Sequence, residues 1–174
     1  MKPLECVRRA KIQQAVEGYL ELGMPRQALD ALDRLGDPTD FDARSLHLWG
    51  EALRMQERFN EALLPLERAA KAMPGNIHVW LALGWCYKRT NQLDLAIESL
   101  EKALCCEPTE ALLHYNLACY WSLSGVKQRT MKYLSQALEI NPDYILMVDD
   151  EPDFDMIRFD PDFRALCDRS TARG

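Results

Sequence analysis

Long apolar runs are absent from this 174-residue sequence, and none approaches the roughly 18–20 residues that a membrane-spanning helix requires. The first residues, MKPLECVRRAK, lack the apolar stretch of a signal peptide. Paired cysteines are missing too, because the 6 cysteines show no CxxC spacing and have no paired histidines. We therefore expect a cytoplasmic protein with reduced cysteines, no membrane partner, no disulfide framework and no metal site.

An excess of basic residues is also lacking. Lysine and arginine number 21 against 27 acidic residues, so the net charge is -6 and the pI is near 5.1. A nucleic-acid-binding protein needs a basic surface to neutralise phosphates, and that class is not expected. Hydrophobic residues make up 48% and charged residues 28% of the chain, a balance typical of a folded soluble protein.

What the sequence does contain is an internal repeat. Residues 43–76, 77–110 and 111–144 align without a gap at a period of 34, and Pro74, Pro108 and Pro142 mark the register. Counted within each repeat, the recurrent residues are Leu46, Trp80 and His114 at position 4; Trp49, Leu83 and Leu117 at 7; Gly50, Gly84 and Ala118 at 8; Leu53, Tyr87 and Trp121 at 11; Ala62, Ala96 and Thr130 at 20; Leu66, Leu100 and Leu134 at 24; and Ala69, Ala103 and Ala137 at 27.

This pattern resembles that of the tetratricopeptide repeat (TPR) family. The resemblance implies an all-α fold, a right-handed α-solenoid of antiparallel helix pairs. The residues support it independently, because positions 4, 7, 8 and 11 follow the rhythm of one helix face and positions 20, 24 and 27 that of a second. Small residues at positions 8 and 20 let the two helices approach closely, and the proline at position 32 ends the second helix. One such pair cannot bury its apolar faces alone, so neighbouring pairs must stack.

A weaker fourth copy precedes the others, at about residues 9–42, which extends the predicted array over 1–144. Its matching residues are Ile12, Ala15, Val16, Tyr19, Ala28, Leu32 and Leu35. Val16 replaces the small residue, and Pro38 comes two positions early. We therefore expect a shortened second helix and an irregular link through residues 37–41.

The remaining residues, 145–174, carry eight acidic residues against four arginines. Asp160 followed by Pro161 predicts the start of a short helix over about 161–168. The segment has too many apolar residues for a free tail: Phe154, Ile157, Phe159, Phe163 and Leu166. We expect an acidic C-terminal capping segment that covers the last repeat. An alternative is that it folds onto a basic groove and blocks it.

No catalytic motif is present: the sequence has no P-loop, no GxGxxG and no HExxH. No Cys, Asp or Glu pattern around His47 and His78 suggests ligation, and His114 occupies a predicted core position. The acidic run from Asp149 has Phe154 where a calcium loop requires glycine. We expect neither an enzyme nor a bound cofactor.

The resemblance also implies a concave groove lined by positions 2, 5, 9, 12 and 13 of the first helices. The candidate groove residues are Arg44, His47, Glu51, Arg54 and Met55; His78, Leu81, Trp85, Lys88 and Arg89; and Leu112, Tyr115, Cys119, Ser122 and Leu123. Basic groups around an aromatic suit an extended peptide bearing carboxylates. Trp85 either contacts such a partner or fills space between neighbouring first helices.

One known groove chemistry does not fit. TPR domains that hold chaperone tails use a carboxylate clamp of lysine, asparagine and arginine residues at set positions. Those positions hold Gln13, Glu17, Leu48, His78 and Ala82 in one register, and His47, Glu51, Ala82, Leu112 and Asn116 in the next. Neither set reproduces the clamp.

The sequence therefore predicts a non-enzymatic protein–protein interaction module whose partner is an unidentified protein or peptide carrying acidic groups. Two alternatives stay open. One is a dedicated chaperone for a secreted or membrane-active client, and the other is a scaffold that self-associates through its end repeats. The partner cannot be named, because one fold hosts unrelated ligands.

Overall fold

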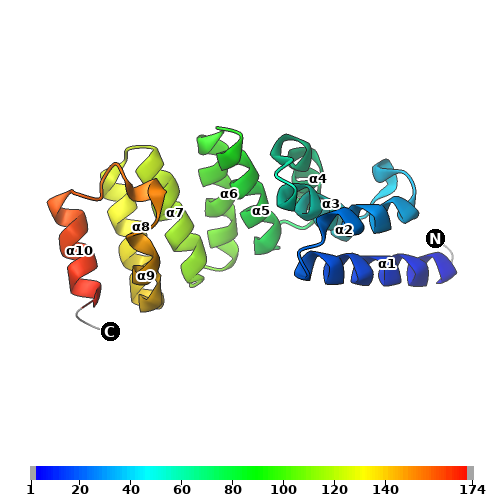
Figure 1. The fold of residues 1–174 in the computed structure, drawn as a ribbon, viewed down its shortest axis with the longest axis horizontal. Helices are drawn as coiled ribbons and strands as arrows, with labels where there is room; N and C mark the ends of the chain where they lie inside the picture. The colour runs from blue at the N-terminus through cyan, green and yellow to red at the C-terminus, as the bar shows by residue number, and fades with distance from the viewer. Residues whose placement is uncertain (1–2, 172–174) are drawn as a thin grey trace. The chain divides into compact units, whose positions relative to one another are not determined.

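The computed structural model describes residues 3–171 of the chain, and this part consists of helices and turns without a β-strand. Figure 1 shows the order of the helices along the chain. Two compact units are distinguished, Met1–Gln92 and Leu93–Gly174, and each is described by itself. Within the described residues, no helix is both long enough and apolar enough to cross a membrane.

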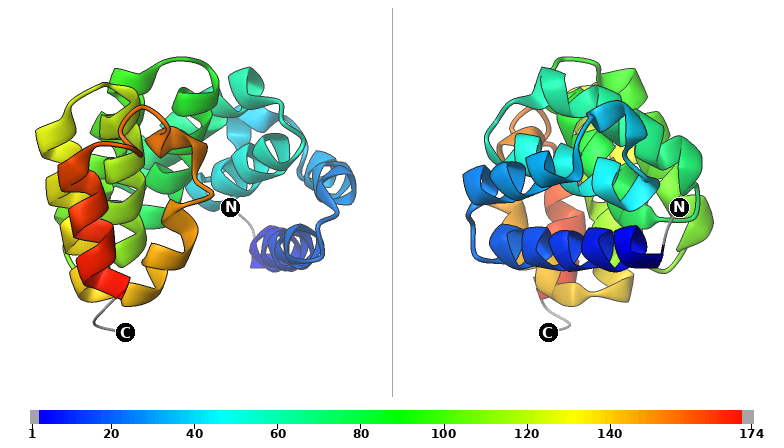
Figure 2. Two further views of the ribbon diagram at one scale, coloured as in Figure 1. Left: turned by 60° about the vertical axis from the view of Figure 1, so that its left-hand side comes forward. Right: turned by 90° about the vertical axis from the view of Figure 1, so that its right-hand side faces the viewer.

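The first unit contains two complete helical hairpins and the first helix of a third. Its elements are α1 (Pro3–Glu21), α2 (Pro25–Leu32), the 3-10 turns η1 (Asp33–Leu35) and η2 (Pro38–Asp40), α3 (Ala43–Met55), α4 (Phe59–Ala72) and α5 (Ile77–Arg89). Each helix packs on the next one along the chain, and α1 and α5 also contact α3. Figure 2 shows α1 and α2 side by side.

The second unit contains a helix, a complete hairpin and the C-terminal segment. Its elements are α6 (Leu93–Cys106), α7 (Ala111–Leu123), α8 (Lys127–Ile140), η3 (Pro142–Tyr144), α9 (Ile145–Val148), η4 (Pro152–Phe154) and α10 (Pro161–Thr171). Helix α7 packs between α6 and α8, η4 lies against α7, and α10 lies against α8 (Figure 1).

The helices follow the 34-residue period of the sequence. First helices begin at Ala43, Ile77 and Ala111, and second helices begin at Phe59, Leu93 and Lys127. Each of the three first helices is capped by the residue before it. The side chains of Asp42, Asn76 and Glu110 accept hydrogen bonds from backbone N–H groups of the first turn. Such caps satisfy amides that have no partner inside the helix.

The turn inside every hairpin places one residue in the left-handed backbone region. These residues are Gly23, Glu57, Asn91 and Gly125, and their φ values lie between 59° and 72°. All four occupy position 15 of their repeats. Glycine adopts this conformation at little cost and asparagine is tolerated there, whereas glutamate is not favoured. The turn therefore keeps its geometry in every repeat although its residue type varies.

The predicted core positions 24 and 27 are buried, whereas Trp49, Trp80 and Trp121 at positions 7, 4 and 11 are half-buried. Leu66, Leu100 and Leu134 at position 24 are fully buried, as are the three alanines at position 27. Position 4 shows why His114 can replace Trp80. Trp80 Nε1 donates to the carbonyl of Pro74 at 2.8 Å, and His114 Nε2 donates to the carbonyl of Pro108 at 2.7 Å. Both rings thus form a hydrogen bond from the first helix of one repeat to the proline at position 32 of the previous repeat.

The first hairpin has the shortened second helix and the irregular link that the sequence predicts. Helix α2 ends at Leu32 and is followed by η1 and η2. Val16 is fully buried as expected, but Ala15 is exposed and the polar Gln13 is buried. Gln13 Nε2 donates to Asp42 Oδ1 and to Ser45 Oγ, both at 2.9 Å. Burial acts to raise the pKa of Asp42, but the hydrogen bonds from Ser45 and Gln13 outweigh it and lower the pKa.

The C-terminal segment is folded against the second unit. Asp160 Oδ1 accepts from the N–H groups of Asp162 and Phe163, so it caps α10 as the sequence predicts. Lys127 at the start of α8 forms 2.7 Å ion pairs with Asp160 and Asp162. Phe154 and Phe163 are buried, whereas Phe159 is 81% exposed. The expectation that Phe159 is buried is therefore wrong, because the turn before α10 directs it to solvent.

Candidate functional site

The predicted groove residues of α3 and α5 fall on one face of each helix. We call the α3–α5 surface the set His47, Glu51 and Arg54 of α3 with His78, Leu81, Trp85 and Lys88 of α5. Their spacings of three and four residues place the side chains of each helix in one row. Helices α3 and α5 pack against each other within the first unit. The two rows therefore belong to neighbouring helices.

A charged group lies on α3. Arg54 donates to Glu51 Oε2 from Nη2 at 2.7 Å and from Nε at 3.0 Å, and His47 Nε2 lies 3.9 Å from Glu51 Oε1. Burial lowers the pKa of His47, and the neighbouring His78 lowers it further, although Glu51 acts in the opposite direction. His47 is therefore mainly neutral at pH 7. The close ion pair on this face of α3 is that of Glu51 with Arg54.

The α3 row also reaches α5. Burial raises the pKa of the Cys86 thiol to about 12, and the charges of Arg54 and Glu51 act on the same thiol. Cys86 is fully buried in α5. The Glu51–Arg54 pair therefore lies next to α5 and fixes part of the α3–α5 surface rather than projecting freely from it.

Trp85 is the large apolar side chain that α5 presents to solvent. It is 40% exposed, and Lys88 Nζ lies 5.7 Å from its ring centroid. Met55 at the end of α3 is 36% exposed. A cation beside a half-exposed indole offers both an apolar contact and an attraction for carboxylates.

Two predicted groove cations have partners elsewhere in the first unit. Arg44 makes a charge-assisted contact with Glu17 of α1, with Nη2 at 2.7 Å from both carboxylate oxygens. The Arg89 guanidinium lies 4.8 Å from the ring centroid of Phe59, at the start of α4. The partners Glu17 and Phe59 were not foreseen from the sequence. The repeat register fixes which positions share a helix face, but it does not fix long-range side-chain pairs.

The fourth-repeat positions differ from the prediction. Tyr115 and Cys119 are both only 2% exposed, so the expectation that they line an open groove is wrong. The Tyr115 ring lies 4.9 Å from Tyr144 and 5.9 Å from Phe154 between ring centroids. Tyr144 ends η3 at the close of the repeat, and Phe154 belongs to the C-terminal segment. Ser122 is also buried, whereas Leu112 and Leu123 remain exposed. The chain's own η4 covers the middle of this helix face.

Comparison with known proteins gives the family context. A family model described as "Tetratricopeptide repeat" matches residues 53–118. Lipopolysaccharide assembly protein B of Haemophilus influenzae is 30% identical over 139 residues, which are 76% of this chain and 34% of that protein. The chain thus spans about a third of the length of this curated relative.

Solved structures show the same fold. YrrB, described as a TPR protein with an unusual peptide-binding site, is 22% identical, with a TM-score of 0.69 over 78% of this chain and 70% of YrrB. MamA from Desulfovibrio magneticus RS-1 is 17% identical, with a TM-score of 0.77 over 99% of this chain and 94% of MamA. At these identities the likeness concerns the fold alone. The shared fold is an α-solenoid of antiparallel helix pairs.

The sequence period, the repeated hairpins with their caps and turns, the family match and the structural neighbours agree with one another. Residues 53–118 match the tetratricopeptide-repeat family, and the described residues share the fold of TPR proteins.

Proposed function

We propose that the chain is a non-enzymatic module that binds an extended, carboxylate-bearing segment of a partner protein at the α3–α5 surface. The observation that carries this proposal is the 40% exposure of Trp85 with Lys88 beside its ring. An aromatic side chain that is accessible yet held on a rigid helix is a typical anchor for a partner. Protein binding is the coarse role that the TPR fold supports.

The charges around Trp85 favour an acidic partner segment. Lys88 places a cation beside the Trp85 ring, whereas the charges of Arg54 and Glu51 are paired with each other on α3. YrrB is described as having a peptide-binding site, which makes a peptide-like ligand a reasonable proposal here as well. We also propose a cytoplasmic location, because a reducing compartment suits the six cysteine thiols found within residues 3–171.

Replacing Trp85 with alanine is expected to weaken binding of acidic partner segments at least about tenfold, which corresponds to about 1.4 kcal/mol. The reason is the loss of the central apolar contact and of the ring beside Lys88. Binding is measured on an array of extended peptides with graded numbers of aspartate and glutamate, and the affinities of the hits are then determined in solution.

The matched control is Leu64→Ala, which removes a 62% exposed apolar side chain from α4 in the same unit. This variant should bind the hits as the unchanged chain does, and circular dichroism should show equal helix content in all three proteins. Equal affinities of the Trp85→Ala and Leu64→Ala variants would exclude the α3–α5 surface as the binding site.

A second candidate function, self-association, is favoured by exposed apolar groups near both ends of the chain. Leu4 is 85% and Val7 54% exposed on α1, where Arg8, Lys11 and Arg34 line the same hollow. In the C-terminal segment, Met156 is 83% and Phe159 81% exposed among acidic residues. A basic apolar face and an acidic apolar face on one chain are complementary, and contacts between different faces of copies link them head to tail.

In sedimentation experiments this candidate predicts an average mass that rises with protein concentration and falls with added salt, because salt screens the charges. The double variant Met156→Ser with Phe159→Ser should shift the mass towards the monomer, whereas Leu64→Ser should leave it unchanged. A single monomeric species at all concentrations would rule this candidate out without affecting the peptide-binding proposal.

A further inference from the structure

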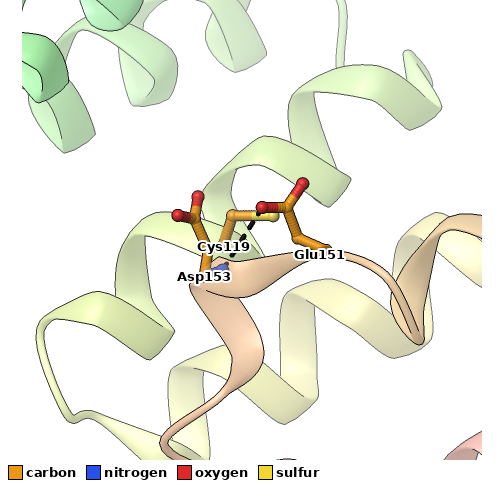
Figure 3. A group of neighbouring side chains, drawn as sticks. All are labelled: Cys119, Glu151 and Asp153. Atoms are coloured by element: carbon orange, nitrogen blue, oxygen red, sulfur yellow. Dashed lines mark hydrogen bonds between the residues drawn. The ribbon is translucent and has the colours of Figure 1, made fainter.

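Three potential metal ligands from distant parts of the sequence meet in the second unit. They are Cys119 of α7 and Glu151 and Asp153 of the C-terminal segment, and their ligand atoms all lie within 4.8 Å of one another. Figure 3 shows Cys119 between the two carboxylates. Cys119 is 2% and Asp153 8% exposed, and Glu151 is half-buried. The site is thus closed on most sides.

The local backbone explains why both carboxylates are presented together. Glu151 is the residue that caps η4, and its Oε1 accepts a hydrogen bond from Asp153 N at 3.2 Å (Figure 3). Pro152 follows as the first residue of η4, where a missing amide hydrogen is harmless. Because η4 packs on α7, this short turn holds the two carboxylates next to Cys119.

The donor set indicates the class of ion. A thiolate combined with two carboxylates matches Zn²⁺, which accepts sulfur and oxygen ligands in one tetrahedral site. Ca²⁺ and Mg²⁺ require oxygen ligands and do not fit a thiolate. Bond lengths of about 2.0–2.3 Å place tetrahedral ligand atoms about 3.3–3.8 Å apart. The ligand atoms of the cluster lie within 4.8 Å of one another, so side-chain rotations that shorten these distances by about 1 Å produce a tetrahedral site.

Tyr115 supplies an independent observation at the same place. Its hydroxyl is buried and finds no partner with hydrogen-bonding geometry among the described residues. The sulfur of Cys119 lies beside it but is only a weak hydrogen-bonding group. Tyr115 lies four residues before Cys119 on α7, so the two side chains share one face of that helix. A buried hydroxyl without a partner is unfavourable and calls for a polar neighbour.

We propose that Cys119, Glu151 and Asp153 bind one thiophilic divalent cation, with Zn²⁺ as the best match, and that this ion fastens the C-terminal segment to α7. On binding, the Cys119 thiol releases its proton to solvent and the thiolate coordinates the ion. A water molecule completes the tetrahedron and forms a hydrogen bond with Tyr115 Oη. The ion joins two segments of the chain, since Cys119 and Glu151 are 32 residues apart in sequence.

The test uses the full chain in a background that lacks the exposed thiols. Cys6, Cys105 and Cys106 are exposed, so they are replaced by serine to remove adventitious binding. Zn²⁺ is removed with a chelator and titrated back by calorimetry, while thermal unfolding is followed by circular dichroism. We expect one ion per chain and a higher Tm with zinc. Co²⁺ in place of zinc should give a near-ultraviolet band of sulfur-to-cobalt charge transfer.

Two variants test the assigned ligands separately. Cys119→Ala should abolish the cobalt band, and Glu151→Gln should weaken zinc binding about 100-fold or more, since even partners outside the coordination shell contribute 10–100-fold. Asp150→Asn is the matched control, because Asp150 is exposed and lies outside the cluster. Glu151 is only half-buried, so its variant stays informative if Cys119→Ala fails to fold.

Three results would overturn the proposal. They are no zinc binding by the background protein, a cobalt complex without the charge-transfer band, and unchanged zinc affinity in the Glu151→Gln variant. None of these results bears on peptide binding at the α3–α5 surface, which lies in the first unit.

Discussion

Replacing Phe154 with alanine is expected to destabilise the second unit by about 3–5 kcal/mol, the usual cost of deleting a fully buried phenylalanine ring. Phe154 is 0% exposed. Its ring centroid lies 5.4 Å from that of Phe163 and 5.9 Å from that of Tyr115, in an edge-on arrangement with Tyr115. The ring therefore joins η4 and α10 to α7, and its loss leaves a cavity between all three elements.

The comparison with Phe159 isolates the effect of burial. Phe159 belongs to the same segment but is 81% exposed, so Phe159→Ala should change the free energy of unfolding by no more than about 0.5 kcal/mol. Urea unfolding followed by circular dichroism measures both variants against the unchanged chain. If the two substitutions cost the same, the segment is not packed on α7 in solution.

Loss of the Phe154 contact also has a chemical readout. Cys119 is covered by the C-terminal segment and is 2% exposed, so a thiol reagent should reach it slowly in the unchanged chain. The Phe154→Ala variant should expose Cys119 more often, because local opening of the segment requires less free energy. Faster labelling of Cys119 at unchanged helix content would show that η4, rather than the whole unit, has opened.

The sequence predicted the parts of the fold that depend on local signals. The 34-residue period placed the three regular hairpins, whose first helices begin at Ala43, Ile77 and Ala111. Asp160 with Pro161 likewise predicted the start of α10. These features are local because the cap and the amides that it satisfies lie within three residues of each other.

The long-range features could not be read from the repeat. Position numbers placed Tyr115 and Cys119 on a groove, but they did not indicate that η4 would cover this face. Aromatic content indicated burial for the C-terminal segment, yet it could not separate the buried Phe154 from the exposed Phe159. The cluster of Cys119 with Glu151 and Asp153 forms because η4 packs on α7, and the spacing of residues along the sequence does not indicate this contact.

Position 8 shows how a packing requirement can be recognised in the sequence and then quantified in the structure. A small residue was predicted there because the two helices of a hairpin approach closely. In the second hairpin this residue is Gly50. A Cβ atom added to Gly50 would lie 2.5 Å from Leu66 Cδ2 and closer still to Leu66 Cγ. Leu66 is fully buried and has little space to move away.

Gly50→Ala is therefore expected to destabilise the first unit by about 1–3 kcal/mol, the usual cost of forcing extra atoms into a packed core. Helix propensity alone predicts the opposite sign, since alanine is favoured over glycine in a helix by about 1 kcal/mol. Gly18→Ala is the matched control, because Gly18 lies inside α1 with nothing within 4 Å of an added Cβ. There alanine should stabilise the unit by up to about 1 kcal/mol. Urea unfolding of both variants distinguishes the two effects, and a gain in stability from Gly50→Ala would contradict close packing of α3 on α4.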